Sequence, residues 1–176
     1  MIAILGSAGS GKSLQGQLLA ARMGWRWLSV GQLLRDTKDR KILRIVRAGK
    51  LVDSKIVNPL VRRAIVKAEK DGTNLILDGY LRNLDQTGEA IENGLKLAIV
   101  MDVDRKEVLK RLRLRGRADD ERKAIEERLD IFNREIEEIE SLLKASRIKV
   151  VHVDGNATVG VVHDRIAEQI KKCHLM

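Results

Sequence analysis

The stretch "GSAGSGKS", residues 6–13, decides the fold of this chain. It follows a short apolar run at residues 1–5 and opens an amphipathic run, so it lies where a strand would pass into a helix. Its pattern G-x-x-x-x-G-K-[ST] is that of a phosphate-binding loop, whose backbone N–H groups turn inward toward a phosphate. The three glycines Gly6, Gly9 and Gly11 allow the tight turns that this geometry needs. In this setting the motif predicts a bound nucleoside triphosphate.

The residues that close the loop have the chemistry of polyphosphate binding. Lys12 can reach the β- and γ-phosphates, and the hydroxyl of Ser13 can ligate Mg²⁺ directly or through water. The helix that begins near Lys12 adds the positive end of its dipole. A glycine-rich turn without a ligand is the alternative, and the complete motif at the first strand–helix junction argues against it. The candidate ATP-binding residues of this loop are Gly9, Ser10, Gly11, Lys12, Ser13 and Leu14.

Short runs rich in Ile, Val and Leu predict buried parallel strands along the rest of the chain. They lie at residues 1–5, 25–30, 74–78, 97–103 and 149–154. Longer amphipathic runs predict helices at residues 12–23, 32–47, 54–70, 104–114, 119–145 and 158–172. Because strands alternate with helices, we expect βαβ units with helices on both faces of a sheet. The prediction is an α/β fold of the P-loop NTPase class, with three layers and about five parallel strands, in a single domain over residues 1–176.

The composition is that of a basic protein with an aliphatic core. Charged residues make up 34% of the chain, and the net charge is +9. A positive balance attracts polyanions, so nucleotides, nucleic acid and acidic membrane surfaces are all candidates. No apolar run approaches the ~18 residues that span a bilayer and no signal peptide is expected, so we expect a cytoplasmic protein that does not bind membranes. Cys173 is the only cysteine, which argues against a Cys-based structural zinc site.

Four further segments occur in a specific order. They are "LSVGQLLR" (28–35), "AGKLVDSKIV" (48–57), "LILDGYLRNLDQ" (75–86) and "RGRADDERKAIEERL" (115–129). Together with the phosphate-binding loop and "VDGNATV" (153–159), they make the chain similar to adenylate kinases, and to nucleoside monophosphate kinases in general, over nearly its whole length. The resemblance implies a helical monophosphate-binding segment at about residues 30–58 and a very short lid at about residues 115–120. It also implies reversible transfer of the γ-phosphoryl group of MgATP to AMP, which gives two ADP.

The resemblance assigns roles around the monophosphate. Arg35 and Arg82 would clamp the phosphate of AMP, because guanidinium groups match phosphate oxygens bidentately. Asp78 ends an apolar strand, where it could order the water shell of Mg²⁺ with Ser13 or simply cap a turn. Gln86 would read the adenine edge, and a solvated surface glutamine is the alternative. The AMP-binding candidates are Val30, Gly31, Arg35, Lys50, Leu51, Val52, Gly79, Arg82 and Gln86.

The arginine-rich stretch "RLRLRGRADDER" (111–122) would serve the other nucleotide. The resemblance implies that Arg111 stacks on the adenine of ATP. It places Arg115, Arg117 and Arg128 around the transferred phosphoryl group, whose charge needs neutralising. For any one of these arginines a plain surface position is the alternative. The further ATP-binding candidates are Arg111, Arg115 and Asn156, and the catalytic candidates are Lys12, Arg82, Arg117 and Arg128.

The sequence departs from the family pattern at several positions. D-G-F-P-R is replaced by D-G-Y-L-R, with Leu81 in place of the proline, and T-G-D is replaced by Val30–Gly31–Gln32. These departures leave a kinase for CMP, UMP or dAMP as an alternative to an ATP:AMP phosphotransferase. The net charge of +9 suggests another alternative, a nucleotide-regulated nucleic-acid-binding protein, which the scarcity of aromatic residues disfavours. We expect ATP and AMP as partners, Mg²⁺ as cofactor, no nucleic acid, and a monomer.

Overall fold

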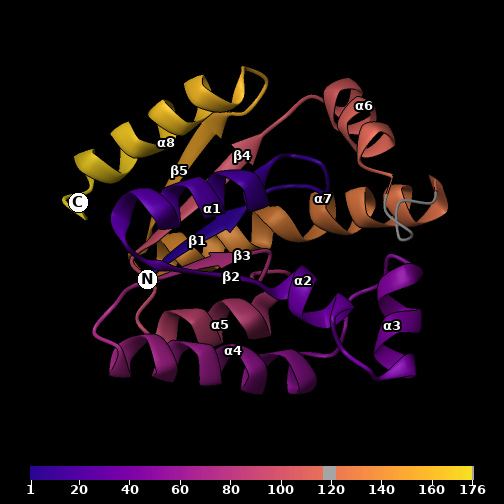
Figure 1. The fold of residues 1–176 in the computed structure, drawn as a ribbon, viewed down its shortest axis with the longest axis horizontal. Helices are drawn as coiled ribbons and strands as arrows, with labels where there is room; N and C mark the ends of the chain where they lie inside the picture. Colours follow the sequence, from indigo (N-terminus) through magenta and orange to yellow (C-terminus); the bar gives the residue numbers. More distant parts are fainter. Residues whose placement is uncertain (117–121, 176) are drawn as a thin grey trace.

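The centre of the molecule is a parallel sheet with the strand order β2-β3-β1-β4-β5 (Figure 1). The computed structural model describes residues 1–116 and 122–175. The strands are β1 (Ile2–Leu5), β2 (Arg26–Ser29), β3 (Leu75–Asp78), β4 (Leu97–Asp102) and β5 (Lys149–Asp154). All the predicted strands are present, and every pairing between neighbours is parallel. The predicted α/β fold with a five-stranded parallel sheet is confirmed.

Helices cover both faces of the sheet, and successive strand residues point to opposite faces. Ile2 and Ile4 face α1 (Lys12–Met23) and α8 (Val159–Lys172), which contribute Leu19 and Ile166 to one core. Ala3 and Leu5 belong to a second core, which is completed by three helices on the other face. These are α4 (Ser54–Lys70), α5 (Leu84–Glu92) and α7 (Arg122–Ala145). Burial on both faces explains why the strands read as continuous apolar runs.

Two helical predictions need correction. The run at 32–47 forms two helices, α2 (Val30–Arg35) and α3 (Arg40–Arg47). The break arises because the side chain of Asp39 accepts hydrogen bonds from the backbone N–H groups of Lys41 (2.7 Å) and Ile42 (3.3 Å), which starts a new helix. Helix α5 was not predicted at all, because its sequence LDQTGEAIE has too few apolar residues to show a helical stripe.

The end of the sheet where the site lies is set by strand register. Ile4 of β1 pairs with Asp78 of β3, so the loop after β1 and the last residue of β3 emerge side by side. In parallel α/β sheets, ligands bind beyond the carboxyl ends of the strands. On this side, α6 (Arg105–Arg115) and the first half of α7 pack against the loop through a third small core that includes Ala8, Val108 and Leu129.

Candidate nucleotide-binding site

The loop after β1 has the backbone geometry of an anion cradle. Gly9 has φ +83°, and a Cβ there would lie 2.8 Å from Cγ of Leu112 and 3.0 Å from the carbonyl oxygen of Val108. Gly11 is the N-cap of α1 with φ +91°, and no side chain in the described part of the chain donates or accepts a capping bond there. The first N–H groups of α1 are therefore available to an external anion.

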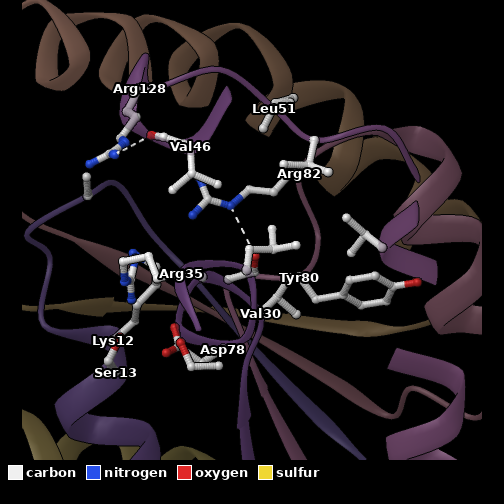
Figure 2. A pocket seen from close by; sticks show the side chains of 18 of the residues that line it. Lys12, Ser13, Val30, Arg35, Val46, Leu51, Asp78, Tyr80, Arg82 and Arg128 are labelled. Carbon is white, nitrogen blue, oxygen red and sulfur yellow. Dashed lines mark hydrogen bonds between the residues drawn. The ribbon is translucent and has the colours of Figure 1, made fainter. Parts of the chain in front are cut away.

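One pocket gathers most of the residues that the sequence singled out (Figure 2). It lies between the loop, the end of β3, helix α2, the segment before α4, and α7. The predicted residues that line it are Lys12, Ser13, Val30, Gly31, Arg35, Lys50, Leu51, Val52, Asp78, Gly79, Arg82, Gln86, Arg115 and Arg128. Every AMP-binding candidate is in this set, although the segments that carry them are far apart in the sequence.

Lys12 lies at the floor of this pocket and is almost fully buried. Its Nζ donates a hydrogen bond to the carbonyl oxygen of Ser7 at 2.8 Å, which folds the side chain back along the loop. Burial, and then the positive charge of Arg82, lower the pKa of Lys12 to about 7, although Asp78 opposes the shift. A phosphate placed here would supply the missing counter-charge.

Asp78 is 1% exposed, and its Oδ2 has no hydrogen-bond partner among the described residues. An orphaned buried carboxylate oxygen is costly unless a cation or a water shell satisfies it. Ser13 follows Lys12 in the chain, and its side chain lines the same pocket. These oxygens fit a hydrated Mg²⁺, which prefers oxygen ligands and keeps several waters. The burial and the orphaned oxygen argue against a plain turn cap.

Guanidinium groups converge on the space above Asp78. Figure 2 shows Arg35, Arg82 and Arg128 turned toward it from α2, the loop after β3 and α7. Nε of Arg82 donates to the carbonyl oxygen of Gly79 at 3.2 Å. Burial lowers the pKa of Arg82, with Asp78 acting in the opposite direction. Nη2 of Arg128 donates to the carbonyl oxygen of Val46 at 3.1 Å, so α7 is joined to the end of α3. Such a cluster of cations is built for a polyanion.

Gln86 is a buried pocket residue with 2% exposure, so its interpretation as a solvated surface glutamine is wrong. Its Oε1 accepts a hydrogen bond from the backbone N–H of Arg82 at 3.1 Å. Its own backbone N–H donates to Oδ1 of Asn83, the N-cap of α5, at 2.9 Å. Helix α5, which was not predicted, therefore carries Gln86 into the pocket beside Arg82.

The remaining ATP-binding candidates do not line this pocket. Arg111 lies behind the loop, where Nη1 donates to the carbonyl oxygen of Ser10 (3.3 Å) and Nη2 donates to that of Gly155 (2.9 Å). Asn156 ties two loops together, because its Oδ1 accepts from the backbone N–H of Asp104 at 3.0 Å. Arg111 and Asn156 thus hold the phosphate-binding loop, α6 and the loop after β5 in one arrangement. Gly9, Ser10, Gly11 and Leu14 also lie outside the pocket lining, and Arg117 lies outside the described residues.

Comparison with known proteins gives a consistent result. The family model for adenylate kinase matches residues 4–148. Adenylate kinase of Prochlorococcus marinus strain MIT 9301 is 30% identical, over 96% of this chain and 97% of that protein. Adenylate kinase of Kocuria rhizophila is also 30% identical, over 96% and 97%. Adenylate kinase 1 of Schistosoma mansoni is 28% identical, over 98% and 93%.

The chain belongs to the adenylate kinase family. Within this family pattern, Leu81 replaces the proline in the loop after β3. Leu81 is 5% exposed and anchors the loop in the core. The bonds from Arg82 Nε to Gly79 and from Arg82 N–H to Gln86 fix the backbone that a proline would otherwise preset. Gln32, which replaces the family's aspartate, accepts from Nη2 of Arg35 at 3.2 Å and donates to Asp36 at 2.7 Å.

Sequence reasoning missed several residues of this adenylate kinase pocket. They are Ala8, Ser29, Leu34, Val46, Gly49, Val57 and Tyr80. Val57 and Leu34 have core-type spacing in their helices, which carries no signal for a pocket. Val46 contributes a backbone carbonyl, which no side-chain pattern reveals. Gly49 has φ +76°. Its position in the block "AGKLV", next to the predicted site residues Lys50, Leu51 and Val52, could have indicated that it lines the pocket.

Two features are absent from the described ranges 1–116 and 122–175. No helix there is long and apolar enough to cross a membrane. No group of three or more His, Cys, Asp and Glu side chains there is arranged to hold a metal ion.

Proposed function

We propose that this chain catalyses the reversible transfer of the γ-phosphoryl group of MgATP to AMP, with two ADP as products. The observation that carries the proposal is the convergence of Lys12, Arg82 and Arg128 above Asp78, next to a buried glutamine. Membership in the adenylate kinase family supports the reaction class and both substrates.

The reaction needs positioning and charge neutralisation more than acid–base chemistry. An oxygen of the AMP phosphate attacks the γ-phosphorus, the bond from the γ-phosphorus to the bridging oxygen breaks, and the bridging oxygen stays with ADP. The attacking oxygen is already ionised near neutral pH, so the site requires no general base. The pocket supplies instead a set of fixed cations aimed at the transferred group.

The proposed roles follow from where each cation is held. Arg35 and Arg82 would hold the AMP phosphate, because both line the pocket, Arg35 beside Gly31 and Arg82 beside Gly79. Lys12 would contact the γ-phosphate of ATP during its transfer, and the backbone N–H groups of the loop would bind the other phosphates. Arg115 and Arg128 would neutralise the charge that spreads over the transferred oxygens, and we propose Arg117 as a further lid arginine.

The rest of the proposed site concerns the metal, the bases and the lid. Ser13 and Asp78 would hold Mg²⁺ through its water shell, and this ion neutralises phosphate charge when MgATP is bound. Gln86 would read the base of AMP. Arg111 and Asn156 would shape the ATP base subsite. We propose a monophosphate-binding segment at about residues 30–58 and a lid at about residues 115–120. A cytoplasmic location and a monomeric state stay predictions.

The first experiment is steady-state ADP formation from MgATP with AMP, CMP, UMP and GMP as acceptors. We expect AMP to be preferred. Arg82→Ala should lower kcat/KM for AMP by about 100-fold or more, as for a lost transition-state cation. Arg105→Ala is the matched control, since Arg105 is an exposed arginine of α6 outside the pocket. Equal losses in the two variants, or turnover that does not depend on a monophosphate, would overturn the proposal.

A further inference from the structure

The wall of the pocket at the start of α5 contains two hydrogen bonds that both involve Gln86. Oδ1 of Asn83 accepts from the backbone N–H of Gln86 at 2.9 Å, and Oε1 of Gln86 accepts from the backbone N–H of Arg82 at 3.1 Å. This is a capping box in which the glutamine reaches one residue further back than usual. The side chain of Gln86 is thus part of the helix cap as well as of the pocket lining.

The cap determines which end of the Gln86 amide faces the ligand. A backbone N–H can only donate, so the atom beside Arg82 N must be the amide oxygen and not the amide nitrogen. A flipped amide would place two donors against each other in a site where Gln86 is 2% exposed. The NH₂ group is therefore the end that is left for a bound base.

Asn83 is itself held by the neighbouring helix. Its Nδ2 donates to Oγ of Ser54 at 3.1 Å, and Ser54 is the 9% exposed first residue of α4. The backbone carbonyl of Asn83 also accepts from the hydroxyl of Thr87 at 2.8 Å. The cap of α5 is therefore fixed to α4, the helix that follows the pocket residues Leu51 and Val52.

We propose that Asn83, tethered by Ser54, is a positioning residue that sets the base selectivity of the acceptor site, because it holds the backbone of Gln86 where the N–H of Arg82 can orient the Gln86 amide with its NH₂ group toward the base. The proposal rests on the proposed function. The pocket then takes a base whose ring nitrogen accepts a hydrogen bond at the Watson–Crick position. Adenine N1 and cytosine N3 accept, whereas guanine N1–H and uracil N3–H donate and would face another donor. Selection is thus for AMP over GMP and for CMP over UMP.

The test compares AMP with 1-deaza-AMP, in which a C–H replaces the ring acceptor. Both dissociation constants are measured by calorimetry, and both kcat/KM values at saturating MgATP. For the unaltered protein we expect AMP to be favoured by about 10-fold or more, as for a site whose polar group loses its partner. In Asn83→Ala this preference should fall at least ~3-fold, which corresponds to one neutral hydrogen bond, with KM for ATP unchanged.

Three further variants separate positioning from general destabilisation. Asn83→Asp should restore the preference, because a carboxylate can accept from both Gln86 N–H and the Ser54 hydroxyl. Ser54→Ala keeps the cap and removes only the tether, so it should reduce the preference even if Asn83→Ala fails to fold. Asn93→Ala is the matched control, because Asn93 bonds the Glu89 carbonyl at the far end of α5 (2.7 Å).

The possible results are distinguishable. A folded Asn83→Ala or Ser54→Ala variant with an unchanged preference overturns the inference, and so does equal binding of AMP and 1-deaza-AMP by the unaltered protein. Selective AMP binding without turnover would overturn the proposed function and support the inference. Loss of the preference in Asn93→Ala to the same extent would show a structural effect and overturn the positioning role.

Discussion

Lys12 is the residue at which binding chemistry and stability conflict most directly. The side chain is buried among cations, and its pKa is lowered to about 7 from 10.5. A lysine with a lowered pKa destabilises the folded state while it is charged, because the unfolded chain binds the proton more tightly. This penalty is fully present below pH 7 and declines as the pH rises from 7 toward 10.5. The binding site is thus maintained at the expense of stability.

We expect Lys12→Met to separate the two roles. Turnover should fall by about 100-fold or more, because a charge aimed at the transferred group is lost. The ligand-free protein should unfold at a higher temperature, with roughly 2–4 °C for each kcal/mol of relieved penalty. Activity and thermal unfolding at pH 7 give both numbers. Lys41→Met, in an exposed lysine of α3, is the control. A Lys12→Met variant that unfolds at a lower temperature would contradict this prediction.

Binding of ATP should take up a proton above neutral pH. The lysine is largely neutral at pH 8–9 in the ligand-free protein, since its pKa is about 7, and a bound polyphosphate raises that pKa. Calorimetric titration in two buffers of different ionisation enthalpy should show uptake approaching one proton at pH 8.5 and much less at pH 6. Lys12→Met should abolish the difference between buffers. Equal uptake in that variant would assign the proton to another group.

At the scale of elements, contacts between helices and strands that are remote in sequence do most of the positioning. The loop after α3 approaches α7 so closely that a Cβ on Gly49 would lie 2.6 Å from the carbonyl oxygen of Ala124. The bond from Arg128 to the carbonyl of Val46 joins the same two elements. The end of α3, the loop after it and α7 are therefore packed against one another in this structure.

Gly49→Ala should push this contact apart and lower kcat. Gly94→Ala is the matched control, because Gly94 also has a positive φ (+81°, against +76° for Gly49) but nothing lies within 4 Å of its added Cβ. Both variants carry similar backbone strain, of order 1 kcal/mol, and Gly49→Ala adds the clash with the backbone of Ala124, so its unfolding free energy should fall further than that of Gly94→Ala. We expect a loss of kcat of about 10-fold or more only in Gly49→Ala. Equal kcat in the two variants would show that the contact has no part in turnover.

The edge strand β5 is held by a histidine that contacts two carboxylates. Nδ1 of His152 lies 2.9 Å from Oδ2 of Asp102 on β4, and Nε2 lies 3.2 Å from Oε1 of Glu140 on α7. Burial alone would lower the pKa of His152, but the hydrogen bonds and charges of Asp102 and Glu140 outweigh it and raise the pKa. Lys144 also contacts Glu140, at 2.9 Å, so the cluster is not purely acidic.

This cluster predicts a pH-dependent contribution to stability. A raised folded pKa stabilises the protein fully below the ordinary value of 6.5, and the contribution is lost as the pH rises through the folded pKa. His152→Ala should therefore destabilise more at pH 5.5 than at pH 8.5, by up to ~1 kcal/mol because the pair is half exposed. Urea unfolding of both proteins at the two pH values measures the difference. If the difference in unfolding free energy between the two proteins does not change with pH, protonation of His152 is not its source.

At the scale of the whole molecule, the chain is basic, with a net charge of +9, and several of its cations line one pocket. Lys12, Arg35, Arg82 and Arg128 line it, and among the described residues of its lining Asp78 is the acidic one. Charges of like sign held together destabilise the ligand-free fold, and a bound polyanion relieves the repulsion while it binds only the folded state.

We therefore expect inorganic tripolyphosphate to raise the unfolding temperature much more than NaCl at equal ionic strength. At 100 times its dissociation constant a ligand contributes ~2.7 kcal/mol, which is several degrees for a chain of this size. The unfolding temperature measured with each salt tests this expectation. Arg82→Ala should reduce the tripolyphosphate shift, whereas Arg105→Ala should not. Equal shifts with both salts would mean that general screening, and not the pocket, is responsible.

The strands, the phosphate-binding loop and the family blocks can be identified from the amino-acid sequence alone. These are local features: an apolar run buried on both sides, a glycine turn and a helix start need only neighbouring residues to specify them. Asp78 was found because a carboxylate at the end of an apolar strand has a local signature, whereas Arg82 was found through the resemblance of its block to adenylate kinases.

The tertiary structure decided what depends on contacts between distant segments. Helix α5 has no apolar stripe of its own, and it forms because Asn83 caps it and Ser54 of α4 holds the cap. The amide of Gln86 takes its orientation from the backbone of Arg82, and Arg128 takes its direction from a carbonyl on α3. Backbone N–H and carbonyl groups are alike in different residue types, so the sequence does not show which of them a side chain will contact. The free energy of such contacts also depends on burial that only the folded chain creates. The cations of the pocket can therefore be identified from the sequence, but the geometry that brings them together into a site cannot.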